Sequence, residues 1–150
     1  MKPFFLTAVA VGLLVAAGAP AGEGKKDKAA LQGVWKVVTI EERGNSKEDN
    51  EGHEVVFKGD EFTLRKGDQT MIKATIKLDP TKKPKQIDLK ITEDRKNKHV
   101  GETAEGIYEL EKDQLKLCIV EPGSGGARPT EFAAPAGTKQ VVVTLKRANP

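Results

Sequence analysis

The chain has 150 residues, of which 31% are charged and 37% hydrophobic, and its formal net charge is +3. This length is typical of one domain with a single modest core. Basic and acidic residues are interspersed rather than gathered in a basic stripe, which argues against a nucleic-acid partner. The one cysteine excludes an intramolecular disulfide, so the fold depends on its hydrophobic core.

Residues 1–21 predict a secretory signal peptide. Lys2 supplies a positive charge, the run FFLTAVAVGLLVAAGA is apolar, and Ala19-Pro20-Ala21 offers small residues for cleavage after Ala21. The apolar run is shorter than the roughly 20 residues of a spanning helix, which favours cleavage over a retained anchor. We therefore expect an exported protein, periplasmic or extracellular, without a stable membrane span after cleavage.

The next segment, residues 22–32, is polar except for its AAL triplet and predicts a short N-terminal helix ahead of the main domain, residues 33–150. Residues 34–43 (VWKVVTIEER) predict the first strand, because Val, Ile, Thr and Trp favour a pleated surface. Residues 44–52 (GNSKEDNEG) predict a solvated loop.

Metal ligation is not predicted. The acidic loop 44–52 lacks the ordered oxygen-ligand spacing of a calcium site. His53, His99 and Cys118 do not have the spacing of a zinc site. We therefore expect neither a metal nor another cofactor.

Residues 53–79 predict three strands separated by two Gly-Asp pairs. Apolar and polar residues alternate along them, as in a strand with one buried and one exposed face. The same alternation returns around Leu89, Tyr108, Leu117 and Val143, beyond a proline-rich connection that excludes helix and central strand.

About eight strands joined by mostly short connections predict an all-β fold, an antiparallel up-and-down barrel with a short N-terminal helix. Closure is favoured because it removes exposed sheet edges. A barrel of this size is either filled by side chains or wide enough for one small ligand. The inward rows that line such a cavity, or fill a packed core, are Phe62, Leu64, Ile72, Ile76, Leu89, Tyr108, Leu117 and Val143.

Cys118 lies in the strand LKLCIV, on the face opposite Leu117. A reactive thiol needs a nearby base or cation to lower its pKa, and neither His53 nor His99 stands at a spacing that implies contact. The serines lack a G-x-S-x-G context. We therefore predict a structural thiol and no catalytic residue.

An apolar strip is expected on the outside of the barrel, where the first and last strands meet. Its members are Val38, Ile40, Cys118, Val120 and Val142. A contiguous apolar patch is uncommon on a monomer's surface, so a cover is expected, either the N-terminal segment or the loop 122–137 with Phe132 as its plug. An ion pair between Arg128 and Glu131 is expected to pin that loop.

Five ordered motifs, LQGVWKVV, LDPTKKPKQIDL, GIYEL, LKLCIV and RPTEF, resemble those of a small exported domain family of planctomycete bacteria whose function is unknown. In addition, Gly33-Val34-Trp35 is similar to the G-x-W signature of lipocalins. That resemblance implies a lipocalin-like barrel in which Trp35 closes one end and Arg147 packs on its ring through a cation–π contact. Trp35 as an ordinary core aromatic is the alternative.

The function expected from these features is non-enzymatic: an exported barrel that binds a small apolar or amphipathic ligand. The alternative is a structural or interaction module with a packed core and an envelope protein as its partner. A cavity distinguishes the first from the second. An enzyme instead requires convergent polar groups in a cleft, which no motif demands.

Overall fold

The computed structural model describes residues 24–149. Residues 24–31 form a helix, and the predicted signal peptide lies outside the described residues. The strands are β1 (Gly33–Glu42), β2 (Asn45–Glu48), β3 (His53–Lys58), β4 (Glu61–Lys66), β5 (Gln69–Asp79), β6 (Lys85–Asp94), β7 (Thr103–Glu111), β8 (Gln114–Val120) and β9 (Gln140–Arg147). No helix within residues 24–149 has the length and apolar character needed to cross a membrane.

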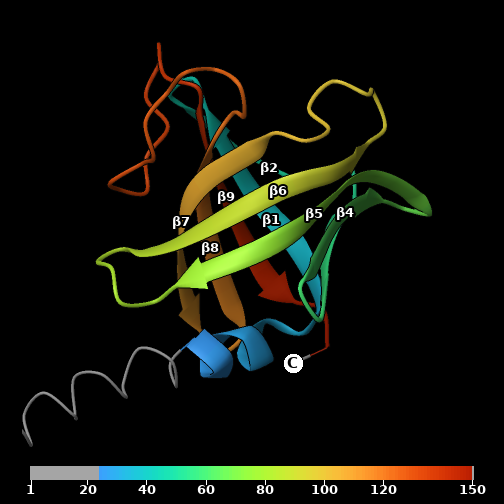
Figure 1. Ribbon diagram of the computed structural model, residues 1–150. Helices are drawn as coiled ribbons and strands as arrows, with labels where there is room; N and C mark the ends of the chain where they lie inside the picture. The colour runs from blue at the N-terminus through green and yellow to red at the C-terminus, as the bar shows by residue number, and fades with distance from the viewer. Residues whose placement is uncertain (1–23, 150) are drawn as a thin grey trace, which may run out of the picture.

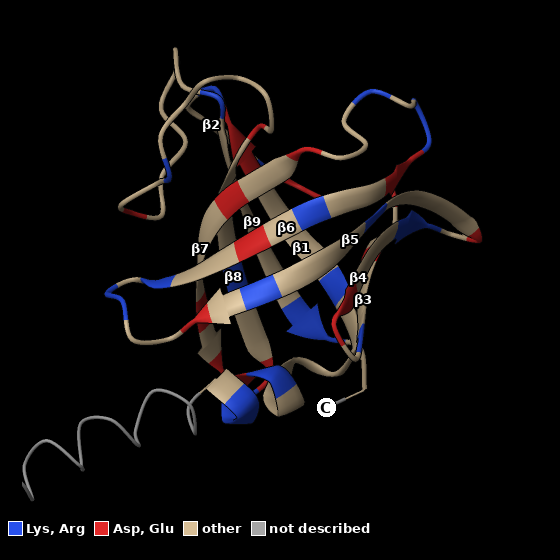
Figure 2. Ribbon diagram, viewed as in Figure 1, with Lys and Arg blue, Asp and Glu red and all other residues tan. Residues whose placement is uncertain are grey.

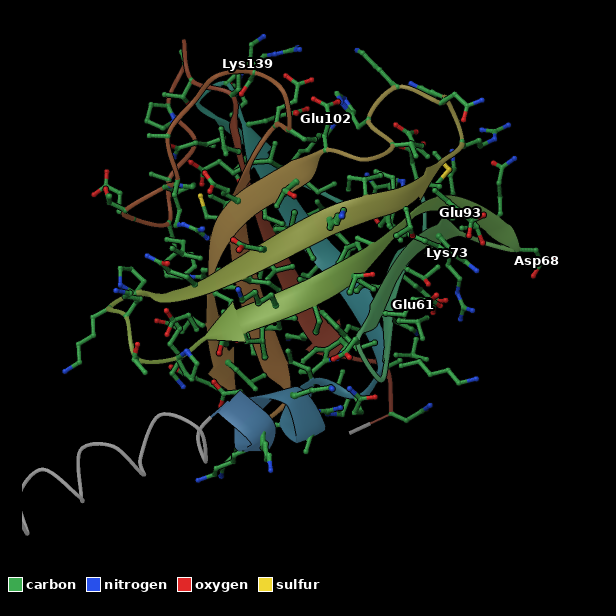
Figure 3. The ribbon with its side chains drawn as sticks, viewed as in Figure 1. Glu61, Asp68, Lys73, Glu93, Glu102 and Lys139 are labelled. Carbon is green, nitrogen blue, oxygen red and sulfur yellow. The ribbon has the colours of Figure 1, made fainter. Side chains whose placement is uncertain are left out.

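Eight of these strands form a closed antiparallel barrel. Each strand from β3 to β8 pairs with the next in sequence, β1 pairs with β3, and the β1–β9 ladder closes the barrel (Figure 1). The predicted up-and-down barrel with a short helix is confirmed. Charged residues recur along β5, β6 and β7 (Figure 2), and Lys73 on β5 pairs with Glu93 on β6 at 3.5 Å (Figure 3).

The prediction of a loop over residues 44–52 is partly wrong, because β2 forms a hairpin with the end of β1. Arg43 and Gly44 join the two strands, and both have positive φ, 53° and 77°. Two consecutive residues with positive φ match the tight turn that suits the twist of a hairpin. Since every residue of β2 is exposed, no apolar alternation marked it in the sequence.

A β-bulge in β1 corrects a second expectation. The register with β9 shifts between Val37 and Thr39, so Val38 is an extra residue in the ladder. An extra residue reverses which side chains face inward beyond it. Ile40, expected on the exterior, therefore packs against the main core, and Glu42 enters the lining of the interior.

The helix closes one end of the barrel (Figure 1). Leu31 and Trp35 are 1% and 0% exposed, and the Trp35 Nε1–H donates to the Leu31 carbonyl at 2.8 Å. The Arg147 guanidinium lies 4.3 Å from the centre of the Trp35 ring and donates to the carbonyls of Ala30 and Gln32 at 2.7 and 3.0 Å. Stacking and hydrogen bonding together hold the helix against the barrel.

A buried carboxylate fixes the same helix from its other side. Asp27 is 8% exposed and accepts a 2.6 Å hydrogen bond from the Tyr108 hydroxyl. The Lys85 ammonium donates to the same oxygen at 3.0 Å. Buried charges are tolerated when they are paired and hydrogen-bonded, and here strands β6 and β7 supply both partners.

Candidate functional site

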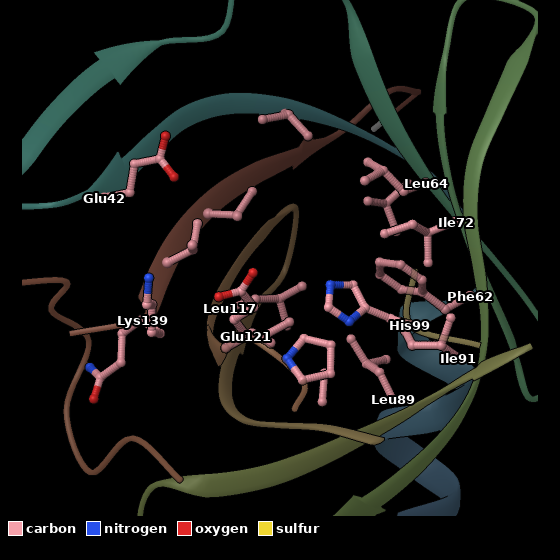
Figure 4. Close-up of a pocket in the computed structure, with 18 of the residues that line it drawn as sticks. Glu42, Phe62, Leu64, Ile72, Leu89, Ile91, His99, Leu117, Glu121 and Lys139 are labelled. Atoms are coloured by element: carbon pink, nitrogen blue, oxygen red, sulfur yellow. The ribbon is translucent and has the colours of Figure 1, made fainter. Parts of the chain in front are cut away.

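The barrel interior is hollow at the end away from the helix. The cavity there has a volume of about 480 Å³, within the roughly 300–1,000 Å³ of small-molecule pockets. Its wall is mainly aliphatic and aromatic (Figure 4). Six of the residues expected on the inward rows lie in this wall: Phe62, Leu64, Ile72, Leu89, Leu117 and Val143.

Two residues of the expected lining lie elsewhere. Ile76 is 6% exposed and belongs to the packed core, and Tyr108 is bonded to Asp27 beneath the helix. Alternation along a strand tells which side chains point inward. It does not tell how deep along the barrel axis each one lies, so it does not separate the packed end from the hollow one.

The mouth of the cavity carries polar groups that the sequence did not identify. Glu42, His99 and Glu121 are half-buried, whereas Arg43 and Lys139 are exposed. Figure 4 shows the His99 ring and the Glu121 carboxylate directed into the cavity. The bulge in β1 turns Glu42 inward, and no pattern in the sequence predicts that bulge. His99 lies in a polar connection whose fold over the mouth has no signature in the sequence.

The connection between β6 and β7 is shaped by Asp94. Its carboxylate accepts hydrogen bonds from the backbone amides of Lys96, Lys98 and His99 at 2.9, 3.2 and 3.0 Å. These bonds, first that of Lys96, hold the pKa of Asp94 below its usual value. The His99 Nδ1 lies 2.9 Å from the Glu102 Oε1, so both ends of the connection orient the imidazole.

Cys118 lies on the outside of the barrel but is 0% exposed. It packs with Ile107, Val142 and Ala134 in a second apolar cluster, against which Phe132 also packs. Burial raises the pKa of the Cys118 thiol, which donates to the Ala133 carbonyl at 3.5 Å. The β8–β9 loop thus covers Cys118 and Val142 of the expected strip, and the thiol faces away from the cavity.

The prediction of an ion pair between Arg128 and Glu131 is wrong. Arg128 instead pairs with Asp88 at 2.7 Å and with Glu105 at 3.4 Å, and it donates to the Gly106 carbonyl at 3.0 Å. Glu131 is exposed. Arg128 therefore fastens the loop to β6 and β7 across the barrel surface rather than to itself, a long-range contact that local spacing cannot predict.

One group of side chains has the composition of a metal site. Ligand atoms of Asp49, Glu51 and His53 lie within 4.8 Å of one another. Lys66 already pairs with Glu51 at 2.7 Å. Burial raises the pKa of Asp49. Hydrogen bonds from the His53 ring and amide lower that pKa by more than burial raises it, so the pKa of Asp49 lies below its usual value. These contacts explain why the three side chains lie together: they hold the connection between β2 and β3 in place.

Comparisons of the chain with family models, with curated proteins and with solved structures found no match. The resemblances to the planctomycete domain family and to lipocalins therefore remain predictions. The cavity and the residues at its mouth are the features of the molecule that bear on its function.

Proposed function

We propose that this protein is an exported, non-enzymatic barrel that binds one small apolar or amphipathic molecule in its open end. The observation that carries the proposal is the cavity of about 480 Å³ in an otherwise packed barrel. Protein interiors are normally close-packed, and an unfilled apolar space forfeits dispersion contacts. A ligand that fills the space restores those contacts and removes its own apolar surface from water.

The division of polar and apolar residues supports an amphipathic ligand. Apolar side chains such as Leu64, Leu89 and Leu117 line the wall, whereas Glu42 and Glu121 lie at the mouth. Pockets for small molecules combine a mostly apolar wall with a few polar groups that set orientation. We infer that the apolar part of the ligand enters first and that its polar end stays at the mouth.

A binding role fits better than a catalytic one. The thiol of Cys118 is buried beneath the β8–β9 loop, outside the barrel, and its pKa is raised by burial. A raised pKa is the opposite of what an activated thiol requires. A packed-core interaction module, the other candidate, is disfavoured because its interior has no use for a cavity.

Native mass spectrometry tests the proposal on protein purified from cells that express the full sequence. We expect a species heavier than the polypeptide by one small molecule, released by organic solvent. N-phenyl-1-naphthylamine, whose fluorescence rises in apolar surroundings, then reports binding to the emptied protein. Saturable binding of one probe per chain supports the proposal.

A matched pair of variants locates the binding. Val143 lines the cavity, and Val100 is 51% exposed outside it. Val143→Trp fills space in the cavity and is expected to weaken probe binding at least about tenfold, by loss of the apolar surface that the probe buries. Val100→Trp makes the same change and is expected to have no effect. Equal binding by both variants, with both folded by circular dichroism, contradicts the proposal.

A further inference from the structure

The charged groups at the mouth of the cavity differ in how they meet solvent. Glu42 ends β1 and Glu121 follows β8, and both line the cavity and are half-buried. Within residues 24–149, neither carboxylate forms an ion pair. A partly desolvated carboxylate beside an apolar wall is stabilised by a cationic or hydrogen-bonding partner. A ligand can therefore supply the cationic partner of these two carboxylates.

His99 adds a third acceptor. Its Nδ1 lies 2.9 Å from the Glu102 Oε1, and an ionised carboxylate only accepts hydrogen bonds, so Nδ1 is the donor of this pair. In the neutral imidazole the remaining nitrogen, Nε2, is then an acceptor. Figure 4 shows the ring directed into the cavity. The half-buried groups of the mouth thus offer acceptors to a ligand that carries several donors.

The two cations at the mouth do not reverse this preference. Arg43 and Lys139 are exposed, and long basic side chains extend their charges toward water. Lys139 stands opposite Glu121, whose amide donates to its carbonyl at 2.9 Å, yet its ammonium pairs with neither Glu121 nor Glu42. An anionic head group at the mouth would be repelled by the half-buried carboxylates, whereas its attraction to the exposed cations is screened by solvent.

We propose that the ligand of this cavity is a cationic amphiphile: an apolar chain or ring system bearing one protonated amine, with the amine at the mouth, where Glu42, Glu121 and His99 supply acceptors from different sides. This inference rests on the proposed function and specifies its ligand class. An ammonium has three donors and no acceptor, which suits a mouth whose half-buried side chains offer acceptors. The apolar part then occupies the wall formed by residues such as Leu64, Ile72 and Val143.

Three ligands with the same chain separate the head group from the apolar part. Decylamine, decanol and decanoate are each titrated below their aggregation limit, at neutral pH and low salt, against the full chain loaded with N-phenyl-1-naphthylamine. We expect decylamine to displace the probe at a concentration about tenfold lower than decanol, the effect of a charge-assisted hydrogen bond. Decanoate is expected to be the weakest of the three.

Carboxylate variants then assign the preference to residues. Glu42→Gln and Glu121→Gln are each expected to weaken decylamine by about five- to tenfold and to leave decanol unchanged, because only the charge is removed. Glu48→Gln, on the exposed strand β2, is the matched control and is expected to change neither. Lys139→Gln is expected to leave decylamine within about threefold, since an exposed cation contributes little.

The outcomes distinguish the two proposals. Equal binding of the three ligands, or tightest binding of decanoate, overturns the cationic ligand class and leaves the barrel a binding protein. A decylamine preference that survives both glutamine variants, each folded and still able to bind the probe, also overturns it. If native mass spectrometry detects no complex with the probe or with any of the three ligands, both the ligand class and the proposed function fail.

Discussion

The two ends of the barrel are built from the same strands, but one end is packed and the other is hollow. At the helix end, Trp35 is fully buried, and Asp27 has both Tyr108 and Lys85 as partners. At the open end, apolar wall residues surround about 480 Å³ of space, and Glu42 and Glu121 lack ion-pair partners among residues 24–149. Polar groups therefore stabilise the fold at the helix end and remain available to a ligand at the open end.

The largest difference between the ends is expected from one substitution made at each. Leu145 is 0% exposed in the packed core, and Leu64 lines the cavity. Leu145→Ala is expected to lower the free energy of unfolding by about 3–4 kcal/mol, because it removes packing and leaves a void. Leu64→Ala is expected to lower it by only about 1–2 kcal/mol, because its surroundings are already incompletely packed. Urea denaturation measures both, and equal losses would contradict the contrast.

The buried carboxylate predicts the next largest effect. Tyr108→Phe removes the hydroxyl that donates to Asp27 and is expected to lower the free energy of unfolding by about 1–3 kcal/mol, since a buried acceptor loses a donor. Thr81→Val removes a comparable 2.6 Å hydrogen bond to Asp79 at an exposed turn. Water replaces that donor, so the expected loss is under about 0.5 kcal/mol. Similar losses for the two variants would show that Asp27 is not a buried anchor.

The loop over Cys118 predicts a smaller change in stability with a large change in reactivity. Because burial raises the pKa of the thiol, a disulfide reagent is expected to label the native protein very slowly at mildly alkaline pH. Arg128→Ala removes the loop's bonds to Asp88 and Gly106 and is expected to speed labelling at least about tenfold. The unfolding free energy is expected to fall by only about 1 kcal/mol. Rapid labelling of the unmodified protein would refute the buried thiol.

The ionisation of the same thiol makes the stability of the fold depend on pH in a definite direction. The unfolded chain releases the Cys118 proton at lower pH than the folded chain, because only the folded state raises the pKa of the thiol. Stability from this group is therefore fully present below the unfolded pKa and is lost as pH rises through the folded pKa. Replacing Cys118 with Ala is expected to remove this alkaline loss from urea midpoints measured across the range.

At the open end, Asp94 predicts an acid titration of the connection between β6 and β7. The pKa of its carboxyl is lowered below 3.8, so the bonds that shape the connection before His99 persist until pH falls through that lowered pKa. The backbone amide resonances of Lys96 and His99 are expected to titrate together with a midpoint below 3.8. A midpoint at or above that value would mean that Asp94 does not hold this connection in solution.

The sequence predicted the barrel because alternation is a local property of each strand. Ile72, Ala74 and Ile76 share one face of β5, and short turns made the neighbouring strands antiparallel. The bulge at Val38 was not predicted, since Val, Thr and Ile suit a regular strand equally well. That one residue decides that Glu42 faces the cavity.

The candidate site was predicted in its wall and missed at its mouth. Leu89 and Leu117 belong to inward rows that alternation reveals. His99 and Glu121 lie in connections, whose positions depend on bonds such as those that Asp94 accepts within its own connection and the one between the Glu121 amide and the Lys139 carbonyl. Those bonds join residues whose spacing carries no periodic signal, so only the folded structure brings them to the cavity.

Methyl-resolved NMR tests whether a small molecule binds in the open end of the barrel. Titration with N-phenyl-1-naphthylamine is expected to shift the methyl resonances of Leu64, Ile72, Leu117 and Val143, which line the cavity, and to leave those of Leu31 and Leu145 at the packed end unchanged. Absence of any shift, or shifts confined to the outer surface around Val142, would contradict the claim.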